Sequence, residues 1–248
     1  MEILSSRLLA AFKHGFTTRL GGVSRPPYES LNLGGSVGDD PAHVAANWTR
    51  LRAATGLGFA RVKQVHGCQV VRADRAHEPE EEADIVVTSS PGVAACVSVA
   101  DCVPVLLADP RTGAVAAIHA GWRGTLARAA AVAVAALARD FGARPGDLLA
   151  AVGPSIGPCC YDVSADLAEQ FRLEFGPTVA EARAVGSRLD LWLANELTLL
   201  GVGLERARVE VLRRCTSCET DLLFSHRRGE GKTGRQVGFI APRSAGLS

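Results

Sequence analysis

The sequence predicts a mixed-sheet α/β domain in which helices cover the faces of the sheets. Short apolar segments rich in β-branched residues follow one another between residues 84 and 120, and turn residues bound each of them. Helical segments interleave with these and later strands without strict alternation. Charge and hydrophobicity shift nowhere along the chain, so residues 1–248 are expected to form one domain.

The N-terminal third is predicted to contain a strand, a helix and a second strand. The segment HGFTTRLGGVS predicts a short strand that runs into a glycine turn. Asp40 is suited to cap a helix that starts at Pro41 and stops at Gly56. Residues 61–72 alternate in polarity and are rich in valine, which predicts a strand.

The middle of the chain is predicted to form buried strands. The apolar segments ADIVVTS, VAACVSVAD, VPVLLAD and AVAAIHA are short enough to be strands buried on both faces. An alanine-rich helix is expected from Gly124 to about Asp140, with Gly142 as its C-cap. Further strands are predicted at LLAAVG, ARVEVLR and QVGFIAP, and helices near 164–173 and 190–201.

Composition excludes several classes of protein. The 27 basic and 26 acidic residues leave a net charge of +1, so no nucleic-acid partner is expected. No segment is long and apolar enough to span a bilayer, and the first residues lack a signal-peptide core. We therefore expect a cytoplasmic protein, as a monomer. The odd number of cysteines, seven, argues against a disulfide framework in such a chain.

Two segments present residue types suited to catalysis at the ends of predicted strands. KQVHG places His66 before a glycine, although a lone histidine is more often a hydrogen-bonded structural residue. In ADCVP, Asp101 and Cys102 precede Pro104, whose missing N–H interrupts a strand ladder. The neighbouring carboxylate disfavours the alternative that Cys102 is only a small buried hydrophobic residue.

The third segment, HAGWRG, begins at His119, where a buried strand ends, and leads into a helix. Such a junction leaves free backbone N–H groups that suit an anion such as phosphate. Arg123 adds a fork of fixed donors. A tight turn with Trp122 as a core anchor explains this hexapeptide equally well.

Taken together, the three segments predict a zinc site. Two imidazoles and one thiolate, from His66, His119 and Cys102, leave one position of a tetrahedral shell open. Ligands scattered along the chain are typical of a catalytic site, where zinc lowers the pKa of bound water towards ~7. Asp101 is then a candidate proton acceptor, or a residue that orients a ligand.

The remaining cysteines and the basic C-terminal loop are ambiguous. Cys215-x-x-Cys218 has zinc-knuckle spacing, but no second such pair closes a set of four ligands. Cys159 and Cys160 are adjacent and would point to different sides of a regular element, so we interpret both pairs as structural or incidental. The segment SHRRG, which contains Arg228, is either an exposed loop or an anion-binding loop.

In this order and spacing, KQVHG, ADCVP and HAGWRG resemble the laccase-domain family of multicopper polyphenol oxidase type. This family is also called the purine nucleoside phosphorylase or peptidoglycan editing factor family. Supporting similarity extends over nearly the whole chain, through HGFTTRLGGVS, YESLNLG, VGDDP, GPSIGPCCYDV, CT at 215–216, FSHRRG and GR at 234–235. The resemblance implies a layered α/β sandwich related to cysteine-hydrolase-like folds, with zinc on His66, Cys102 and His119. Candidate substrate-binding residues within these motifs are Arg19, Gln64, Arg123 and Arg228.

The resemblance implies several activities. They are phosphorolysis of adenosine, inosine, guanosine and methylthioadenosine, deamination of adenosine, removal of serine from a UDP-MurNAc precursor, and copper-dependent phenol oxidation. Six histidines, of which two lie in strong motifs, do not easily supply a multicopper cluster. The leading hypothesis is a zinc-dependent purine nucleoside phosphorylase with adenosine deaminase activity. The alternatives are a peptidoglycan-precursor amidase with Cys102 as nucleophile, and a non-enzymatic binding protein stabilised by zinc.

Overall fold

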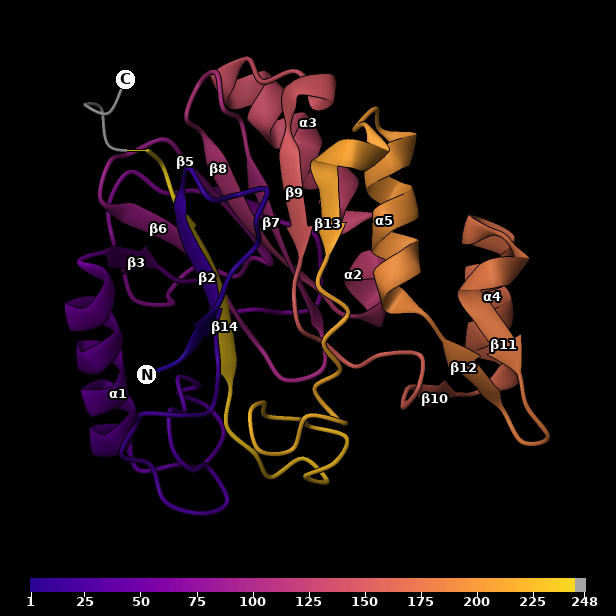
Figure 1. Ribbon diagram of the computed structural model, residues 1–248, viewed down its shortest axis with the longest axis horizontal. Helices are drawn as coiled ribbons and strands as arrows, with labels where there is room; N and C mark the ends of the chain where they lie inside the picture. The colour runs from indigo at the N-terminus through magenta and orange to yellow at the C-terminus, as the bar shows by residue number, and fades with distance from the viewer. Residues whose placement is uncertain (244–248) are drawn as a thin grey trace.

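The computed structural model describes residues 1–243. In it, two large β-sheets pack against each other between layers of helices (Figure 1). Both sheets contain parallel and antiparallel pairs, which confirms the predicted mixed α/β sandwich. The first sheet has the order β1 (Ile3–Leu4), β2 (Lys13–Thr17), β14 (Gln236–Ala241), β6 (Val93–Val99), β3 (Gly58–Ala60). The second has the order β13 (Val209–Val211), β9 (Leu149–Val152), β7 (Val103–Ala108), β8 (Val115–Ala120), β5 (Ile85–Thr88), β4 (Val70–Arg72).

The central strands are buried on both faces, as their continuous apolar runs predict. In β7, Val105 and Leu107 pack in the core that contains the helices behind the second sheet. Leu106 and Ala108, one residue out of phase, pack in the core between the two sheets. Because successive side chains of a strand point to opposite faces, one apolar strand serves two hydrophobic layers.

Helix α1 (Pro41–Thr55) covers the outer face of the first sheet. The Asp40 side chain accepts a hydrogen bond from the backbone N–H of Ala42, and Pro41 is the first helical residue. Gly56 ends the helix in the left-handed conformation, at φ 67°. These capping residues confirm the predicted boundaries.

Helices α3 (Ala129–Phe141) and α5 (Leu191–Gly201), with the short α2 (Trp122–Leu126), cover the second sheet. The alanine-rich face of α3 is buried, and small side chains let the helix approach the sheet closely. The predicted single helix is divided in two, because Arg128 adopts a left-handed φ of 54° between α2 and α3.

The strand predicted over residues 61–72 is wrong for most of its length, since only Val70–Arg72 forms a strand, β4. Residues 61–69 form a loop. Its valines suggested a sheet, but the backbone N–H groups of residues 65–67 bond to a buried side chain that the local pattern does not reveal, as described below.

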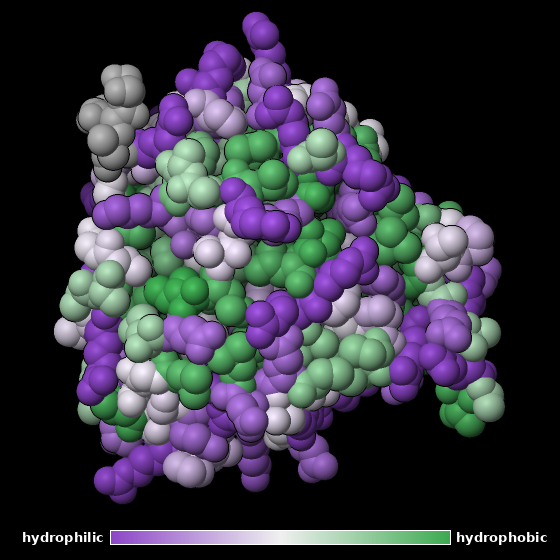
Figure 2. Space-filling model, viewed as in Figure 1, coloured by the Kyte–Doolittle hydropathy of each residue, from purple (hydrophilic) through white to green (hydrophobic). Residues whose placement is uncertain are grey.

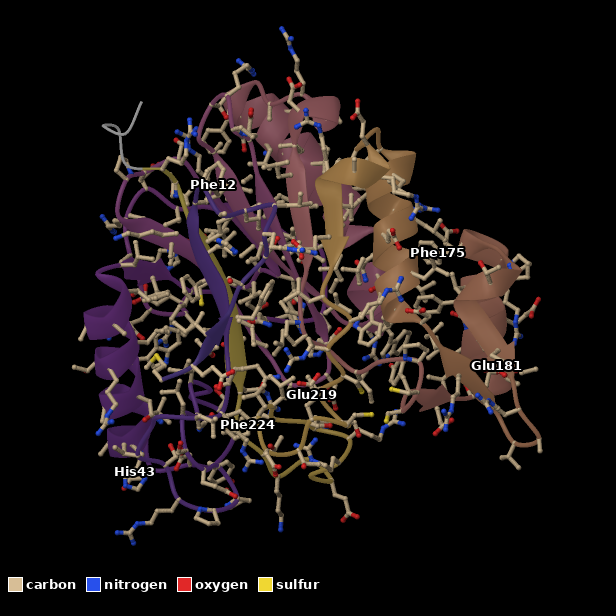
Figure 3. The ribbon with its side chains drawn as sticks, viewed as in Figure 1. Phe12, His43, Phe175, Glu181, Glu219 and Phe224 are labelled. Carbon is tan, nitrogen blue, oxygen red and sulfur yellow. The ribbon has the colours of Figure 1, made fainter. Side chains whose placement is uncertain are left out.

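A small three-stranded sheet and α4 (Ala165–Phe175) lie to one side of the sandwich (Figure 1). Its order is β10 (Asp162–Val163), β12 (Ser187–Leu189), β11 (Ala180–Ala182). These two- and three-residue strands are too short to produce an alternation pattern, so the sequence does not predict them. Figure 3 labels Phe175 of α4 and Glu181 of β11 on this unit. Three 3-10 turns complete the described chain: Pro145–Asp147, Pro177–Val179 and Arg206–Arg208.

Hydrophilic residues are spread over the face shown in Figure 2, with hydrophobic residues between them, mostly towards the centre. Over residues 1–243, none of the helices combines the length and the apolar character that crossing a membrane requires.

Candidate active site

The three predicted metal ligands converge. A ligand atom from each of His66, Cys102 and His119 lies within 4.8 Å of the others, and the two imidazole rings are 4.9 Å apart between centroids. His66 comes from the loop 61–69, Cys102 lies between β6 and β7, and His119 is near the end of β8. Strand ends of the two stacked sheets therefore assemble a site from residues far apart in the sequence.

The backbone around the site is unusual. His66 and Asp101 have φ values of 61° and 88°, in the left-handed region that residues other than glycine rarely adopt. A Cβ atom on Gly121 would lie 2.9 Å from Cys102 Sγ and 3.3 Å from His66 Cδ2, so a larger residue would displace the Cys102 sulfur. Strain of this kind persists where the surrounding structure holds it, and it is concentrated at functional sites.

Asp84 holds the histidines in place. Its buried carboxylate accepts hydrogen bonds from the backbone N–H groups of Val65, His66 and Gly67, at 3.2, 3.0 and 2.6 Å. Asp84 Oδ1 also lies 2.7 Å from His119 Nδ1. When Nδ1 carries the proton for this contact, Nε2 of His119 remains available to a metal.

Sequence reasoning missed Asp84. The available signal was an ionisable residue at the start of the fully buried strand β5, where a carboxylate requires hydrogen-bond donors.

The site favours a thiolate. Burial alone would raise the pKa of the Cys102 thiol, but the charge of His119 and hydrogen bonds with His119 and His66 lower it to about 6. Burial likewise opposes charge on His119, yet the Cys102 thiolate and the Asp84 carboxylate raise the pKa of His119 to about 9. Both shifts describe one thiolate–imidazolium pair. The sulfur therefore has the charge that nucleophilic attack or zinc coordination requires, and zinc binding would in addition displace the Nε2 proton of His119.

The donor set fits a zinc ion. Two imidazoles and one thiolate are ordinary zinc ligands, and the group found within residues 1–243 contains these three donors. Three protein ligands leave a fourth tetrahedral position for a substrate or water, which is the arrangement of catalytic rather than structural zinc sites. The identity of the metal stays a prediction.

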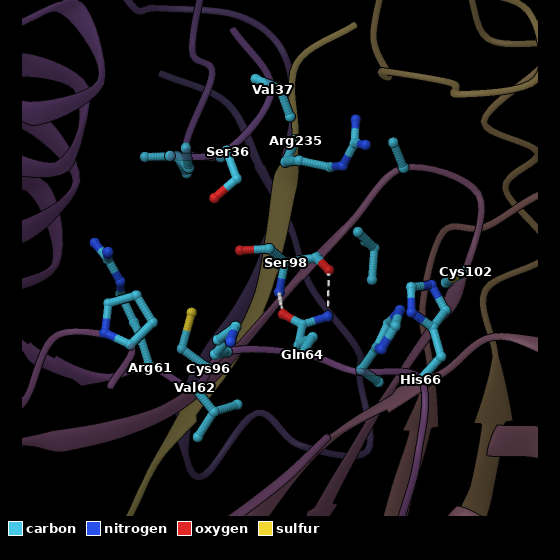
Figure 4. Close-up of a pocket in the computed structure, with 18 of the residues that line it drawn as sticks. Ser36, Val37, Arg61, Val62, Gln64, His66, Cys96, Ser98, Cys102 and Arg235 are labelled. Carbon is cyan, nitrogen blue, oxygen red and sulfur yellow. Dashed lines mark hydrogen bonds between the residues drawn. The ribbon is translucent and has the colours of Figure 1, made fainter. Parts of the chain in front are cut away.

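A cavity of about 630 Å³ adjoins the three ligands (Figure 4). Its size is within the range of small-molecule sites, about 300–1,000 Å³. Two arginines and one lysine line it, besides histidines. Arg61 pairs with Glu78 and Lys63 with Glu82. No carboxylate in the described part of the chain forms a salt bridge with Arg235, whose Nη1 donates to the carbonyls of Thr233 and Gly234 at 3.1 and 3.0 Å. Sequence reasoning noted Arg235 only as part of a motif, and the cavity makes it a candidate anion ligand.

Gln64 also lines the cavity, but both the nitrogen and the oxygen of its side-chain amide form hydrogen bonds with the protein backbone. Its Nε2 donates to the carbonyl of Ser98 at 2.8 Å, and its Oε1 accepts from the Ser98 N–H at 2.8 Å (Figure 4). These bonds join the loop 61–69 to β6 and fix the cavity wall. The predicted contact of Gln64 with substrate stays a prediction.

Two other predicted substrate-binding residues bind backbone carbonyls. The Arg19 guanidinium donates to the carbonyls of Glu29, at 2.9 Å, and Thr220, at 2.8 Å. Arg228 donates to the carbonyls of Leu223, at 2.7 Å, and of Thr216 and Ser217. Neither arginine is among the residues that line the cavity. Their contact with substrate stays a prediction, and the structure gives both a role in holding loops together.

Asp101 and Arg123 lie beside the metal ligands rather than along the cavity wall. The Asp101 carboxylate accepts hydrogen bonds from Thr216 Oγ1 and from the backbone N–H of Arg227, both at 2.6 Å. Arg123 is exposed, and its guanidinium lies 4.2 Å from the centre of the Trp122 ring. The proton-transfer role of Asp101 and the phosphate-binding role of Arg123 stay predictions.

Residues 13–243 match the family described as multi-copper polyphenol oxidoreductase laccase, and the chain belongs to this family, as its motifs predict. Purine nucleoside phosphorylase of Deinococcus radiodurans is 45% identical over 241 residues, which cover 95% of this chain and 92% of the relative. Purine nucleoside phosphorylase YlmD of Geobacillus stearothermophilus is 38% identical over 245 residues, with 92% and 89% covered. The crystal structure of YlmD from Geobacillus stearothermophilus matches with a TM-score of 0.91 at 36% identity, covering 96% of this chain and 94% of that chain.

Proposed function

We propose that the protein is a zinc-dependent purine nucleoside phosphorylase that also deaminates adenosine. The observation that carries this proposal is the convergence of His66, Cys102 and His119 at the wall of a cavity of about 630 Å³. The relatives named purine nucleoside phosphorylase support the choice of substrate class.

In phosphorolysis, a phosphate oxygen attacks C1′ of the ribose, the N-glycosidic bond breaks, and the purine leaves with a proton. His66, Cys102 and His119 would hold zinc, which acts as a Lewis acid towards the reacting group when bound. Asp84 keeps His119 oriented for this role through the 2.7 Å contact. In deamination, water replaces the amino group at C6 of the purine and ammonia leaves, and we assign the proton transfer to Asp101.

The phosphate has two candidate positions. Arg123 and the turn amides near Gly121 form one, and Arg235 in the cavity forms the other. Arginine suits either, because its planar fork binds phosphate through two parallel hydrogen bonds. The variants Arg123→Ala and Arg235→Ala separate them, since the KM for phosphate rises in the variant that has lost the phosphate ligand.

The direct test uses purified protein of measured zinc content. Adenosine with inorganic phosphate should yield adenine and ribose 1-phosphate, and adenosine without phosphate should yield inosine. The Cys102→Ala variant serves as the control. If the zinc-loaded protein forms neither adenine nor inosine and is indistinguishable from Cys102→Ala, the proposal is wrong.

A second candidate function follows from the chain Cys102–His119–Asp84. A thiolate, a histidine and a carboxylate that orients the histidine form the arrangement of a cysteine nucleophile with its base. This arrangement favours the peptidoglycan-precursor amidase. That enzyme would release serine from a UDP-MurNAc-serine substrate, remain active in the presence of a chelator, and leave nucleosides unchanged. The opposite pattern supports the phosphorylase.

A further inference from the structure

A second cluster of metal-binding side chains lies outside the cavity. Cys159, Cys160, Cys215 and Cys218 each place a sulfur within 4.8 Å of the others. The Sγ atom of Cys218 lies 3.6 Å from Sγ of Cys159 and 3.4 Å from Sγ of Cys160. The sequence interpreted both pairs as structural or incidental and offered Cys215-x-x-Cys218 no second pair, whereas the fold brings both pairs to one point.

The sulfur separations suit a shared ion better than a disulfide. A disulfide requires sulfurs about 2.05 Å apart. Four sulfurs at about 2.3 Å from a tetrahedral zinc ion lie about 3.8 Å from one another. The separations of 3.4 and 3.6 Å are close to that edge length.

A tight turn lets the adjacent cysteines face the same point. The N–H groups of Cys160 and Tyr161 both donate to the carbonyl of Gly157, at 2.9 and 3.0 Å, so the chain turns as in a helix. Side chains do not alternate between opposite sides in such a turn as they do in a strand. Cys159 and Cys160 can therefore approach Cys218 together.

The second pair forms a knuckle-like loop. The N–H groups of Cys218 and Glu219 donate to the carbonyl of Cys215, at 3.2 and 3.0 Å, which closes the C-x-x-C turn. The N–H of Gly157 donates to Cys215 Sγ at 3.3 Å. A backbone donor at the sulfur stabilises thiolate charge and joins the two cysteine segments directly. Figure 3 labels Glu219, which belongs to this loop.

We propose that Cys159, Cys160, Cys215 and Cys218 bind a zinc ion as a closed, all-thiolate structural site. Binding displaces the thiol protons to solvent and leaves an ion with four sulfurs. Positive charge is available nearby, because the Arg228 guanidinium donates to the carbonyls of Thr216 and Ser217 within the loop. Four protein ligands close the coordination shell, so this ion has no open position for a substrate.

The site stabilises the segment that holds Asp101. Thr216, next to Cys215, donates to Asp101 Oδ1 at 2.6 Å, and the Ile156 N–H donates to the Asp101 carbonyl at 2.9 Å. Both cysteine segments thus contact the residue that precedes Cys102. The second ion would hold these contacts together without joining the reaction.

The first experiment counts zinc per chain in the full protein. Wild type is expected to hold two ions, and Cys218→Ser and Cys102→Ala one each, whereas the control Cys96→Ala keeps two. Cobalt-substituted Cys102→Ala should show the ligand-field and charge-transfer bands of an all-sulfur tetrahedral ion, and Cys218→Ser should lose them. The proposal is overturned if the wild type holds only one zinc ion and the Cys218→Ser variant retains that ion.

Alkylation of the native wild type provides a test that does not depend on a variant folding. Cys159 and Cys218 are exposed, so an alkylating reagent can reach a metal-free thiol at either position. Both are expected to resist alkylation in the metal-loaded protein and to react after a chelator is added. Equal reaction with and without metal, or an intact mass two hydrogen atoms lighter because of a disulfide, overturns the proposal.

Discussion

The two sulfur-containing clusters differ in how the fold builds them. His66, Cys102 and His119 sit at strand ends and in one loop, close to the buried Asp84. The four cysteines sit in two turns near the surface, and their sulfurs have mainly one another and a backbone N–H as neighbours. The first cluster has three candidate ligands beside the cavity of about 630 Å³. The second has four candidate ligands, none of which lines that cavity.

The two clusters therefore differ in the type and number of their candidate ligands and in the structure that supports them. A rigid scaffold with one open position suits catalysis, whereas a closed shell on two turns suits the stabilisation of loops. Variants in each cluster test this distinction.

Cys102→Ala should reduce phosphorolysis of adenosine by about 10³-fold, because the Lewis acid worth several kcal/mol is lost. Cys218→Ser should reduce it by less than about tenfold, since that ion only supports loops. Steady-state rates with saturating phosphate measure both. Equal losses in the two variants would show that the clusters do not have separate roles.

Gly121→Ala should reduce activity by about 100-fold, because a displacement of the reacting groups of about 1 Å has that effect. The new Cβ would lie 2.9 Å from Cys102 Sγ, which must then move. Gly201→Ala is the matched control, since no heavy atom lies within 4 Å of its added Cβ. Similar rates for Gly121→Ala and wild type would mean that the ligand geometry tolerates this shift.

Cys218→Ser should lower the melting temperature by roughly 5–10 °C in the presence of zinc. Free zinc at 100 times its Kd stabilises the folded protein by about 2.7 kcal/mol. A change of 1 kcal/mol in the free energy of unfolding shifts Tm by roughly 2–4 °C for a chain of this size. Calorimetry with and without chelator checks this, because the variant should respond less to chelation than wild type does. An identical response contradicts a structural ion at the four cysteines.

Asp84→Asn should weaken zinc binding at His66, Cys102 and His119 by about 10–100-fold, the usual effect of removing the partner of a ligating histidine. Competition with a chromophoric chelator measures this affinity. Asp109→Asn is the matched control, because Asp109 is equally buried and accepts bonds from Arg111 and Thr112 in a distant turn. Weakening in both variants would indicate a general loss of stability.

Glu210→Gln should have the smallest effect and leave both clusters loaded. Burial raises the pKa of Glu210, but hydrogen bonds from Ser6 and the Leu8 N–H lower it overall, below its ordinary value of 4.5. The stabilisation by the charged form is therefore present above pH 4.5 and is lost as the pH falls through the lower, folded-state pKa. Urea unfolding should show wild type more stable by about 1 kcal/mol at pH 7, and the difference should shrink in acid. A difference that grows in acid contradicts the assignment.

The sequence by itself determined the elements whose signals are local. Asp40, Pro41 and Gly56 mark a helix because caps act on neighbouring residues. Continuous apolar runs indicated β5 to β8, because burial on both faces removes the alternation. Residue type and motif order also predicted His66, Cys102 and His119 as candidate metal ligands, and the structure brings their side chains together.

Only the tertiary structure decided which distant side chains meet. Residues 65–67 do not continue a strand because their N–H groups bond to Asp84, which follows some twenty residues later in the chain. Adjacent cysteines share a site with a distant C-x-x-C pair because two turns meet. Local sequence patterns indicate the conformation of a few neighbouring residues. They do not depend on partners far along the chain, so contacts with such partners are determined by tertiary packing.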